Sequence, residues 1–260
     1  MAGKDGKGPA AVLFDVDGTL VDTNYLNAVT WWEAFRQAGH DVPMAVVHRT
    51  IGMGSDLMLD KLLPGDRDRG ADADIRTSHT ALYAVYWSRL RPLPGAAGLL
   101  RACKKRGLAV VLASSADERE FSMLRSVLDA EDAIDEATFS GEVDASKPAP
   151  DLVKVALDKA GVPAEDAVFV GDTVWDAQAC RKASVPCIGV LSGGSSRDEL
   201  TEAGAAEIYT GPAELLAALP QSMLGRLRPI RGSSFFFIRV AGELMLRGWA
   251  RGRRVAGGRD

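Results

Sequence analysis

The sequence of 260 residues is poor in cysteine and has no long apolar run. Its three cysteines, Cys103, Cys180 and Cys187, lack C-x-x-C spacing and are odd in number, which argues against a disulfide framework and a zinc site. No apolar run reaches the roughly 18 residues of a membrane span, and the polar start MAGKDGKGPA lacks the apolar core of a signal peptide. We therefore expect a cytoplasmic protein with buried thiols.

The chain also lacks the excess of positive charge that a nucleic-acid binder needs, because its net charge is −4. The charge is unevenly distributed. Residues 221–260 contain nine arginines and two acidic residues, a local charge of +7, which leaves −11 for residues 1–220. We expect 221–260 to be a basic C-terminal extension that is disordered or poorly packed. Association of its arginines and aromatic residues with an anionic surface is the weaker alternative.

Short apolar runs alternate with amphipathic stretches over most of the chain. AVLF, LAVVLASS, AVFVGDT and PCIGVLSGG are rich in Val, Leu and Ile and end in small or polar residues, as buried parallel strands do. DEREFSMLRSVLDA and APDLVKVALDKAGV have the apolar spacing of helices. This alternation predicts an α/β fold with a parallel sheet covered by helices on both faces.

Residues 22–92 interrupt the alternation. YLNAVTWWEAFRQAG and SHTALYAVYWSRL are amphipathic and helix-like, no strand pattern separates them, and RPLPG marks the return to the sheet. We therefore predict an all-helical insertion at 22–92, called the cap below. The catalytic core would consist of residues 9–21 and 93–220.

Polar residues occur where the predicted strands end. The carboxyl ends of parallel strands meet at one edge of a sheet, so these residues should lie close together. Several carboxylates at one place repel one another unless a cation joins them, and an oxygen-only ligand set suits Mg²⁺. A lysine and a hydroxyl beside magnesium are what phosphoryl transfer requires. The residues are Asp15, Asp17, Ser114, Ser115, Lys147, Asp172 and Asp176.

The order of these motifs resembles the haloacid dehalogenase-like superfamily of phosphotransferases. D-x-D-G-T at 15–19, a serine after the second strand, Lys-Pro at 147–148 and G-D-x-x-x-D at 171–176 occur in the family's order. The resemblance covers about residues 10–219 and includes the helical insertion. It implies a Rossmann-like three-layer core with a helical cap.

The resemblance also implies a role for each position. Asp15 would be the nucleophile and Asp17 the general acid and base. Ser114 and Lys147 would be catalytic and hold the phosphoryl group, with Ser115 as the alternative hydroxyl and Thr19 also near the substrate. Magnesium would be held by Asp15, by the backbone carbonyl of Asp17 and by Asp172. Asp176 would support the metal shell or orient Lys147.

In the cap, the segment HRTIGMGSDLML contains Arg49 and Gly52 before a predicted helix. Related capped phosphatases use such a loop to recognise the leaving group, so both residues are candidate substrate contacts. The alternative is a helix-to-helix turn with Arg49 on a solvated face.

Among activities, the resemblance favours hydrolysis of a small phosphorylated metabolite by a phosphatase. The dehalogenases of this superfamily lack an acidic residue at the position of Asp17, because a halide leaves without being protonated. The presence of Asp17 therefore favours phosphate chemistry. The β-phosphoglucomutase-like members usually carry a histidine where Asn27 stands, so a sugar-phosphate mutase is the second hypothesis. A non-catalytic binding scaffold is a third, although such proteins typically lose the nucleophile, the lysine or a metal carboxylate.

Overall fold

The computed structural model describes residues 10–227 and contains one six-stranded sheet in the order β3-β2-β1-β4-β5-β6. All neighbouring strands are parallel. The first strand lies at the centre, where Phe14 is paired with Leu112 on one side and Val170 on the other. The strands are β1 (Ala11–Phe14), β2 (Ala109–Ala113), β3 (Glu136–Thr138), β4 (Ala167–Gly171), β5 (Cys187–Val190) and β6 (Glu207–Tyr209).

Helices cover both faces of the sheet, and the strand residues alternate between the two layers. Val12 and Phe14 pack with Leu99 of α5 on one face, whereas Leu13 packs with Val153 of α7 on the other. The first layer contains α5 (Ala96–Lys105), α6 (Glu118–Leu128), α10 (Pro212–Ala217) and α11 (Met223–Arg226), and the second α7 (Asp151–Ala160), α8 (Val174–Ala183) and α9 (Arg197–Ala203). The predicted three-layer α/β core is confirmed.

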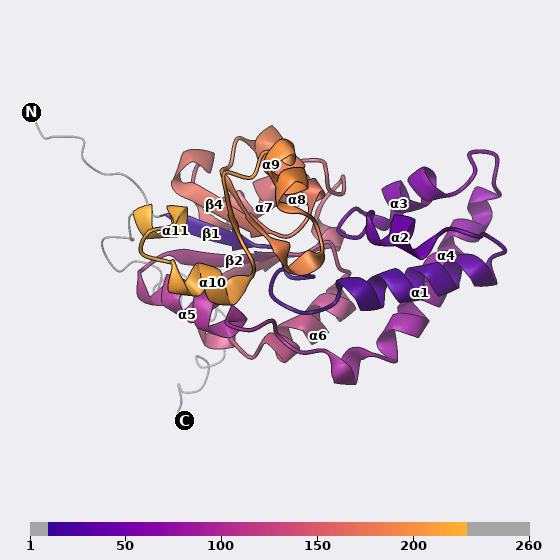
Figure 1. Cartoon of the computed structure of the whole chain (residues 1–260), viewed down its shortest axis with the longest axis horizontal. Helices are drawn as coiled ribbons and strands as arrows, with labels where there is room; N and C mark the ends of the chain where they lie inside the picture. The colour runs from indigo at the N-terminus through magenta and orange to yellow at the C-terminus, as the bar shows by residue number, and fades with distance from the viewer. Residues whose placement is uncertain (1–9, 228–260) are drawn as a thin grey trace, which may run out of the picture.

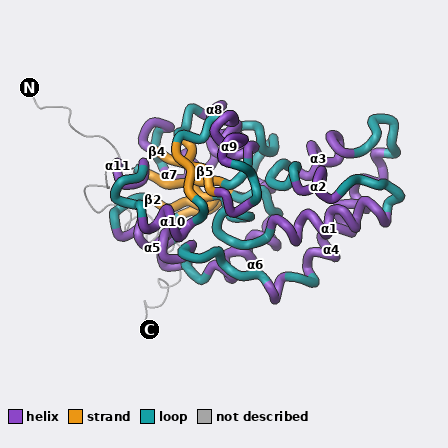
Figure 2. The backbone as a smooth tube through the Cα atoms, viewed as in Figure 1, coloured by secondary structure: helices purple, strands orange, loops and turns teal. Residues whose placement is uncertain are grey.

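The insertion after β1 forms a separate helical layer, at the right of Figure 1. Its helices are α1 (Asn24–Gln37), α2 (Met44–His48), α3 (Ser55–Leu62) and α4 (Asp72–Ala84). They enclose a hydrophobic cluster of their own, which includes Trp31, Phe35 and Met58. The strands of the core, by contrast, all lie at the opposite side of the molecule (Figure 2).

Short 3-10 turns connect these elements at Arg69–Ala71, Trp87–Arg89, Glu131–Ala133, Ser140–Glu142, Ala164–Asp166 and Leu191–Gly193. The start of the predicted C-terminal extension packs on the core: Leu224 of α11 is fully buried, and Arg106 donates to the carbonyl of Gly225 at 2.7 Å. The remainder of the extension, 228–260, lies outside the described residues. Within residues 10–227, no helix is long and apolar enough to cross a membrane.

Candidate active site

Asp15 directly follows β1 and lies in a tight loop at the carboxyl edge of the sheet. Its backbone N–H donates to the carbonyl of Val170 at 2.9 Å, which continues the pairing of β1 with β4 by one residue. The loop turns at Gly18, where φ is +74° and a Cβ would lie 2.5 Å from a carboxylate oxygen of Asp172. Only glycine combines this backbone conformation with so close an approach. The turn brings the Thr19 hydroxyl to the carboxylates, and it donates to Asp172 Oδ1 at 2.8 Å and to Asp15 Oδ2 at 3.2 Å.

Lys147 is buried between two carboxylates. Its Nζ lies 2.5 Å from Asp15 Oδ1 and 2.7 Å from Asp176 Oδ1, and its side chain is 1% exposed. Burial alone would lower the pKa of the Lys147 ammonium, but the charges of Asp15 and Asp176 outweigh this effect and raise it above its ordinary value. The structure therefore fixes a permanent positive charge directly beside Asp15.

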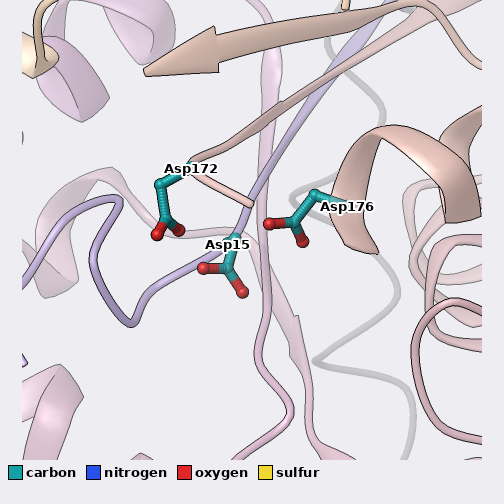
Figure 3. Close-up of side chains that lie close together, drawn as sticks. All are labelled: Asp15, Asp172 and Asp176. Carbon is teal, nitrogen blue, oxygen red and sulfur yellow. The ribbon is translucent and has the colours of Figure 1, made fainter. Parts of the chain in front are cut away.

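Three carboxylates converge at this point. Asp15, Asp172 and Asp176 each place an oxygen within 4.8 Å of the others, and all three are buried (Figure 3). Asp172 is held by neutral groups, the Thr19 hydroxyl and the Asn24 amide, whose Nδ2 donates to Oδ2 at 2.7 Å. Asp176 lies in the first turn of α8, and its Oδ2 accepts from the Thr173 N–H at 3.1 Å and the Thr173 hydroxyl at 2.6 Å. One oxygen of Asp176, Oδ2, thus caps α8, while the other, Oδ1, contacts Lys147.

The carboxylates at this site could carry more negative charge than the single positive charge of Lys147 can balance. Desolvation raises the pKa of Asp15 and Asp17, and desolvation with repulsion from Asp176 raises the pKa of Asp172 to about 7. Oδ1 of Asp17 is buried and has no hydrogen-bond partner among residues 10–227. A buried oxygen-only donor set with one lysine for several acids has the composition of a site for a hard divalent cation.

The two serines after β2 point to different places. Ser114 is fully buried; its Oγ accepts from the Ala116 N–H at 3.0 Å and donates to Asp17 Oδ2 at 3.5 Å. Ser115 instead lines the cavity that contains Asp15 and Lys147. In this arrangement Ser115 faces the space a phosphoryl group would occupy, while Ser114 supports Asp17. The choice between the two hydroxyls as phosphoryl ligand stays a prediction.

A cavity of about 300 Å³ separates the carboxylates from the cap. Asp15, Asp17, Ser115 and Lys147 line it on the core side. The cap contributes apolar side chains and a polar strip on α4. These cap residues include Asn27, Trp31, Ile51, Gly52, Met58, Arg76, His79 and Thr80.

The cap loop at Gly52 and Gly54 closes directly onto the core. At Gly52 φ is +89° and a Cβ would lie 2.7 Å from Thr173, while a Cβ at Gly54 would collide with Ser146. Arg49, predicted as a substrate contact, does not reach this cavity. Its guanidinium pairs with Glu199 of the core at 2.8 Å and lines a separate cavity of about 270 Å³.

Comparison with known proteins agrees with this geometry. A model of the haloacid dehalogenase-like hydrolases matches residues 9–184. The chain belongs to this family. A phosphoglycolate phosphatase of Rhodospirillum rubrum is 29% identical over 221 residues, covering 80% of this chain and 89% of the relative. One from Neisseria gonorrhoeae is 27% identical over 217 residues, covering 81% and 90%.

Solved structures of the family have the same fold. A hydrolase from Pseudomonas syringae superposes with a TM-score of 0.78 at 31% identity, covering 82% of this chain and 98% of that one. A β-phosphoglucomutase from Clostridium difficile superposes with a TM-score of 0.73 at 18% identity, covering 84% and 98%, and so shares the fold. The predicted haloacid dehalogenase-like family and the predicted class of enzyme, a phosphatase, are confirmed.

Two cap residues in the cavity of this haloacid dehalogenase-like protein were not foreseen from the sequence. Arg76 and His79 both lie on the face of α4 that lines the cavity. No motif marks them. His79 falls in the stretch SHTALYAVYWSRL that the sequence predicts to be helical, whereas Arg76 precedes that stretch.

Proposed function

We propose that the protein is a magnesium-dependent phosphatase that hydrolyses a small phosphomonoester through an aspartyl-phosphate on Asp15. The observation that carries the proposal is the buried Asp15–Lys147 pair at the base of a cavity between the core and the cap. A carboxylate held by a fixed cation is oriented for attack, and the same cation stabilises negative charge on the transferred group.

In the first half of the reaction, an oxygen of Asp15 attacks phosphorus and the bond to the leaving oxygen breaks. Asp17 gives a proton to that oxygen. Burial raises the pKa of Asp17, which favours a protonated carboxyl, and Asp17 lines the cavity that would hold the leaving group. In the second half, Asp17 takes a proton from a water that attacks the aspartyl-phosphate, which frees phosphate and restores Asp15.

The metal ligands in this proposal are Asp15, the backbone carbonyl of Asp17 and Asp172, with Asp176 behind them. When bound, magnesium would supply positive charge to the phosphoryl oxygens. Lys147 holds Asp15 in place throughout, and Ser114 or Ser115 binds a phosphoryl oxygen. Thr19 orients Asp15 and Asp172 through its hydroxyl.

The substrate is a small molecule, because the cavity of about 300 Å³ lies at the lower end of the range for ligand pockets. Its relatives named phosphoglycolate phosphatase make phosphoglycolate the first ester to test.

A sugar-phosphate mutase is the second candidate, and one observation favours it. The mutase-like members usually carry a histidine where Asn27 stands, and here Nε2 of His79 lies 3.2 Å from Asn27 Oδ1. An imidazole is therefore present at that place, although it comes from another helix. β-Glucose 1-phosphate with its bisphosphate tests this activity.

The deciding experiment measures phosphate release from a panel of small phosphomonoesters, with magnesium and with EDTA. We expect magnesium-dependent turnover by the native protein and a loss of at least ~10³-fold in Asp15→Asn. Asp22→Asn, a change at an exposed aspartate just beyond the same loop, is the matched control and should leave the rate unchanged. Equal turnover by the native protein and Asp15→Asn would contradict the proposal.

A further inference from the structure

The cap offers the reaction cavity a polar strip that the chemistry at Asp15 does not use. Arg76, His79 and Thr80 of α4 line the cavity opposite the carboxylates. They lie one turn apart on a helix of 13 residues, so they share a face. A leaving group held in this cavity would contact them.

His79 is fixed in position and uncharged. Its ring stacks on Trp31 with centroids 4.0 Å apart and on Tyr83 with centroids 5.8 Å apart. Desolvation lowers the pKa of His79 to about 3, so the imidazole is neutral at ordinary pH. When Nε2 donates to Asn27 Oδ1 at 3.2 Å, Nδ1 is left as an acceptor. Nδ1 has no hydrogen-bond partner within residues 10–227, so it can accept from a hydroxyl.

Arg76 supplies a positive charge that no carboxylate contacts within residues 10–227. It is half-buried and forms no ion pair with any of the described residues. Asp72, four residues earlier on the same helix, is instead held by Arg67 through two hydrogen bonds of 2.9 and 2.8 Å. Of the basic residues that line the cavity, Lys147 is already paired with carboxylates and Arg76 is not.

The charges on the other walls limit where an anion can lie. Asp117 and Glu120 line the cavity from the side of α6. Asp117 would repel a second anion there, whereas burial raises the pKa of Glu120 and favours its neutral form. A planar guanidinium matches one carboxylate by two parallel hydrogen bonds. A second phosphate would bring nearly two charges to this one cation, so a carboxylate is the better match.

We propose that Arg76 and His79 select a phosphorylated acid that retains a free hydroxyl, with Arg76 binding the carboxylate of the leaving group and His79 accepting a hydrogen bond from that hydroxyl. The proposal rests on the phosphatase function proposed above and specifies the leaving group. It places a hydroxylated acid above the simplest phosphorylated acid, phosphoglycolate, which has no free hydroxyl.

The test compares kcat/KM for three esters that differ in their carboxylate and free hydroxyl groups. 3-Phosphoglycerate has both groups, phosphoglycolate is one carbon shorter and has no free hydroxyl, and glycerol 1-phosphate has a hydroxymethyl group in place of the carboxylate. We expect 3-phosphoglycerate to be the best substrate. Arg76→Met should lower kcat/KM by roughly 10- to 100-fold for the two acids and little for glycerol 1-phosphate. His79→Phe should lower it by roughly 3- to 10-fold for the hydroxylated esters only.

Control variants separate recognition from folding. Arg36→Met removes an exposed cap arginine outside the cavity and should change nothing. His79→Gln retains an acceptor and should restore part of the preference that His79→Phe loses. An equal loss on all three esters in Arg76→Met, or phosphoglycolate as the best substrate, would overturn the proposal.

Binding provides a readout that does not depend on turnover. In Asp15→Asn protein, calorimetry should show 3-phosphoglycerate binding at least ~10-fold more weakly after Arg76→Met. If no phosphomonoester is hydrolysed yet this difference in binding is found, the proposed function fails and the recognition by Arg76 stands. If small esters are hydrolysed but neither Arg76→Met nor His79→Phe changes kcat/KM, the proposed function stands and the proposed recognition by α4 fails.

Discussion

Replacing Asp172 by asparagine should stabilise the metal-free protein and abolish its response to magnesium. Asp172 is fully buried and its hydrogen-bond donors, Thr19 and Asn24, are neutral. Desolvation and the nearby charge of Asp176 raise the pKa of Asp172 from 3.8 to about 7. A raised carboxyl pKa means that the folded state binds the proton more tightly than the unfolded state does.

The sign and size of the effect follow from that difference. The stabilising contribution of protonated Asp172 is complete below about pH 4 and is lost as the pH rises through 7. A difference of about three in pKa corresponds to ~4 kcal/mol as an upper limit. Because the acidic neighbours titrate together, we expect roughly 2–4 kcal/mol, the size of a large single-site effect. An asparagine side chain at this position would avoid the loss, since an amide has no charge to desolvate.

The assay is urea unfolding in EDTA at pH 5 and pH 8. Asp172→Asn should be more stable than the native protein at pH 8 by a few kcal/mol, and by less than half as much at pH 5. Asp41→Asn, at a carboxylate that is 94% exposed, is the control and should show no such difference. Added magnesium should stabilise the native protein more at pH 8 than at pH 5 and leave Asp172→Asn almost unaffected. Equal stabilities at pH 8 would refute the reasoning.

Two further predictions concern the closure of the cap. Arg49→Glu should raise KM about 2- to 5-fold, because it breaks an exposed ion pair between the cap and the core. Adding Glu199→Arg, which reverses both charges of the pair, should return KM to the native value. A double variant with KM still raised would favour a direct substrate contact for Arg49. Gly54→Val should lower kcat/KM at least ~10-fold, because its side chain would collide with Ser146 and hold the cap loop away from the core. Gly65→Val, in an open part of the cap, is the control, and an equal loss there would contradict the steric explanation.

The convergence of the site was predictable from the sequence because parallel strands impose it. Asp15 and Asp172 are far apart in the sequence, yet they directly follow β1 and β4, which are adjacent parallel strands. The apolar runs indicated the central strands, which are buried on both faces. The edge strands β3 and β6 were not predicted, since both are only three residues long and partly exposed, without a clear apolar run.

The helices of the cap were predictable from the sequence, but the side chains that they direct toward the cavity were not. Arg49 points to Glu199 and Arg76 into the cavity because of how the cap packs on the core, and no local pattern reports that orientation. The same holds for His79, whose pairing with Asn27 joins two cap helices 52 residues apart. Helix periodicity gives a shared face but not the direction in which that face points.

The two aspartates of the G-D-x-x-x-D motif differ in their partners, and this difference suggests a division of labour. Asp176 is bound by Lys147 and by the Thr173 hydroxyl and N–H, so its charge is compensated within the protein. Asp172 receives neutral hydrogen bonds alone and retains an uncompensated charge. A buried charge without compensation is costly to folding. A cation bound there would compensate this charge, and in the proposed mechanism Asp176 positions the lysine that holds Asp15.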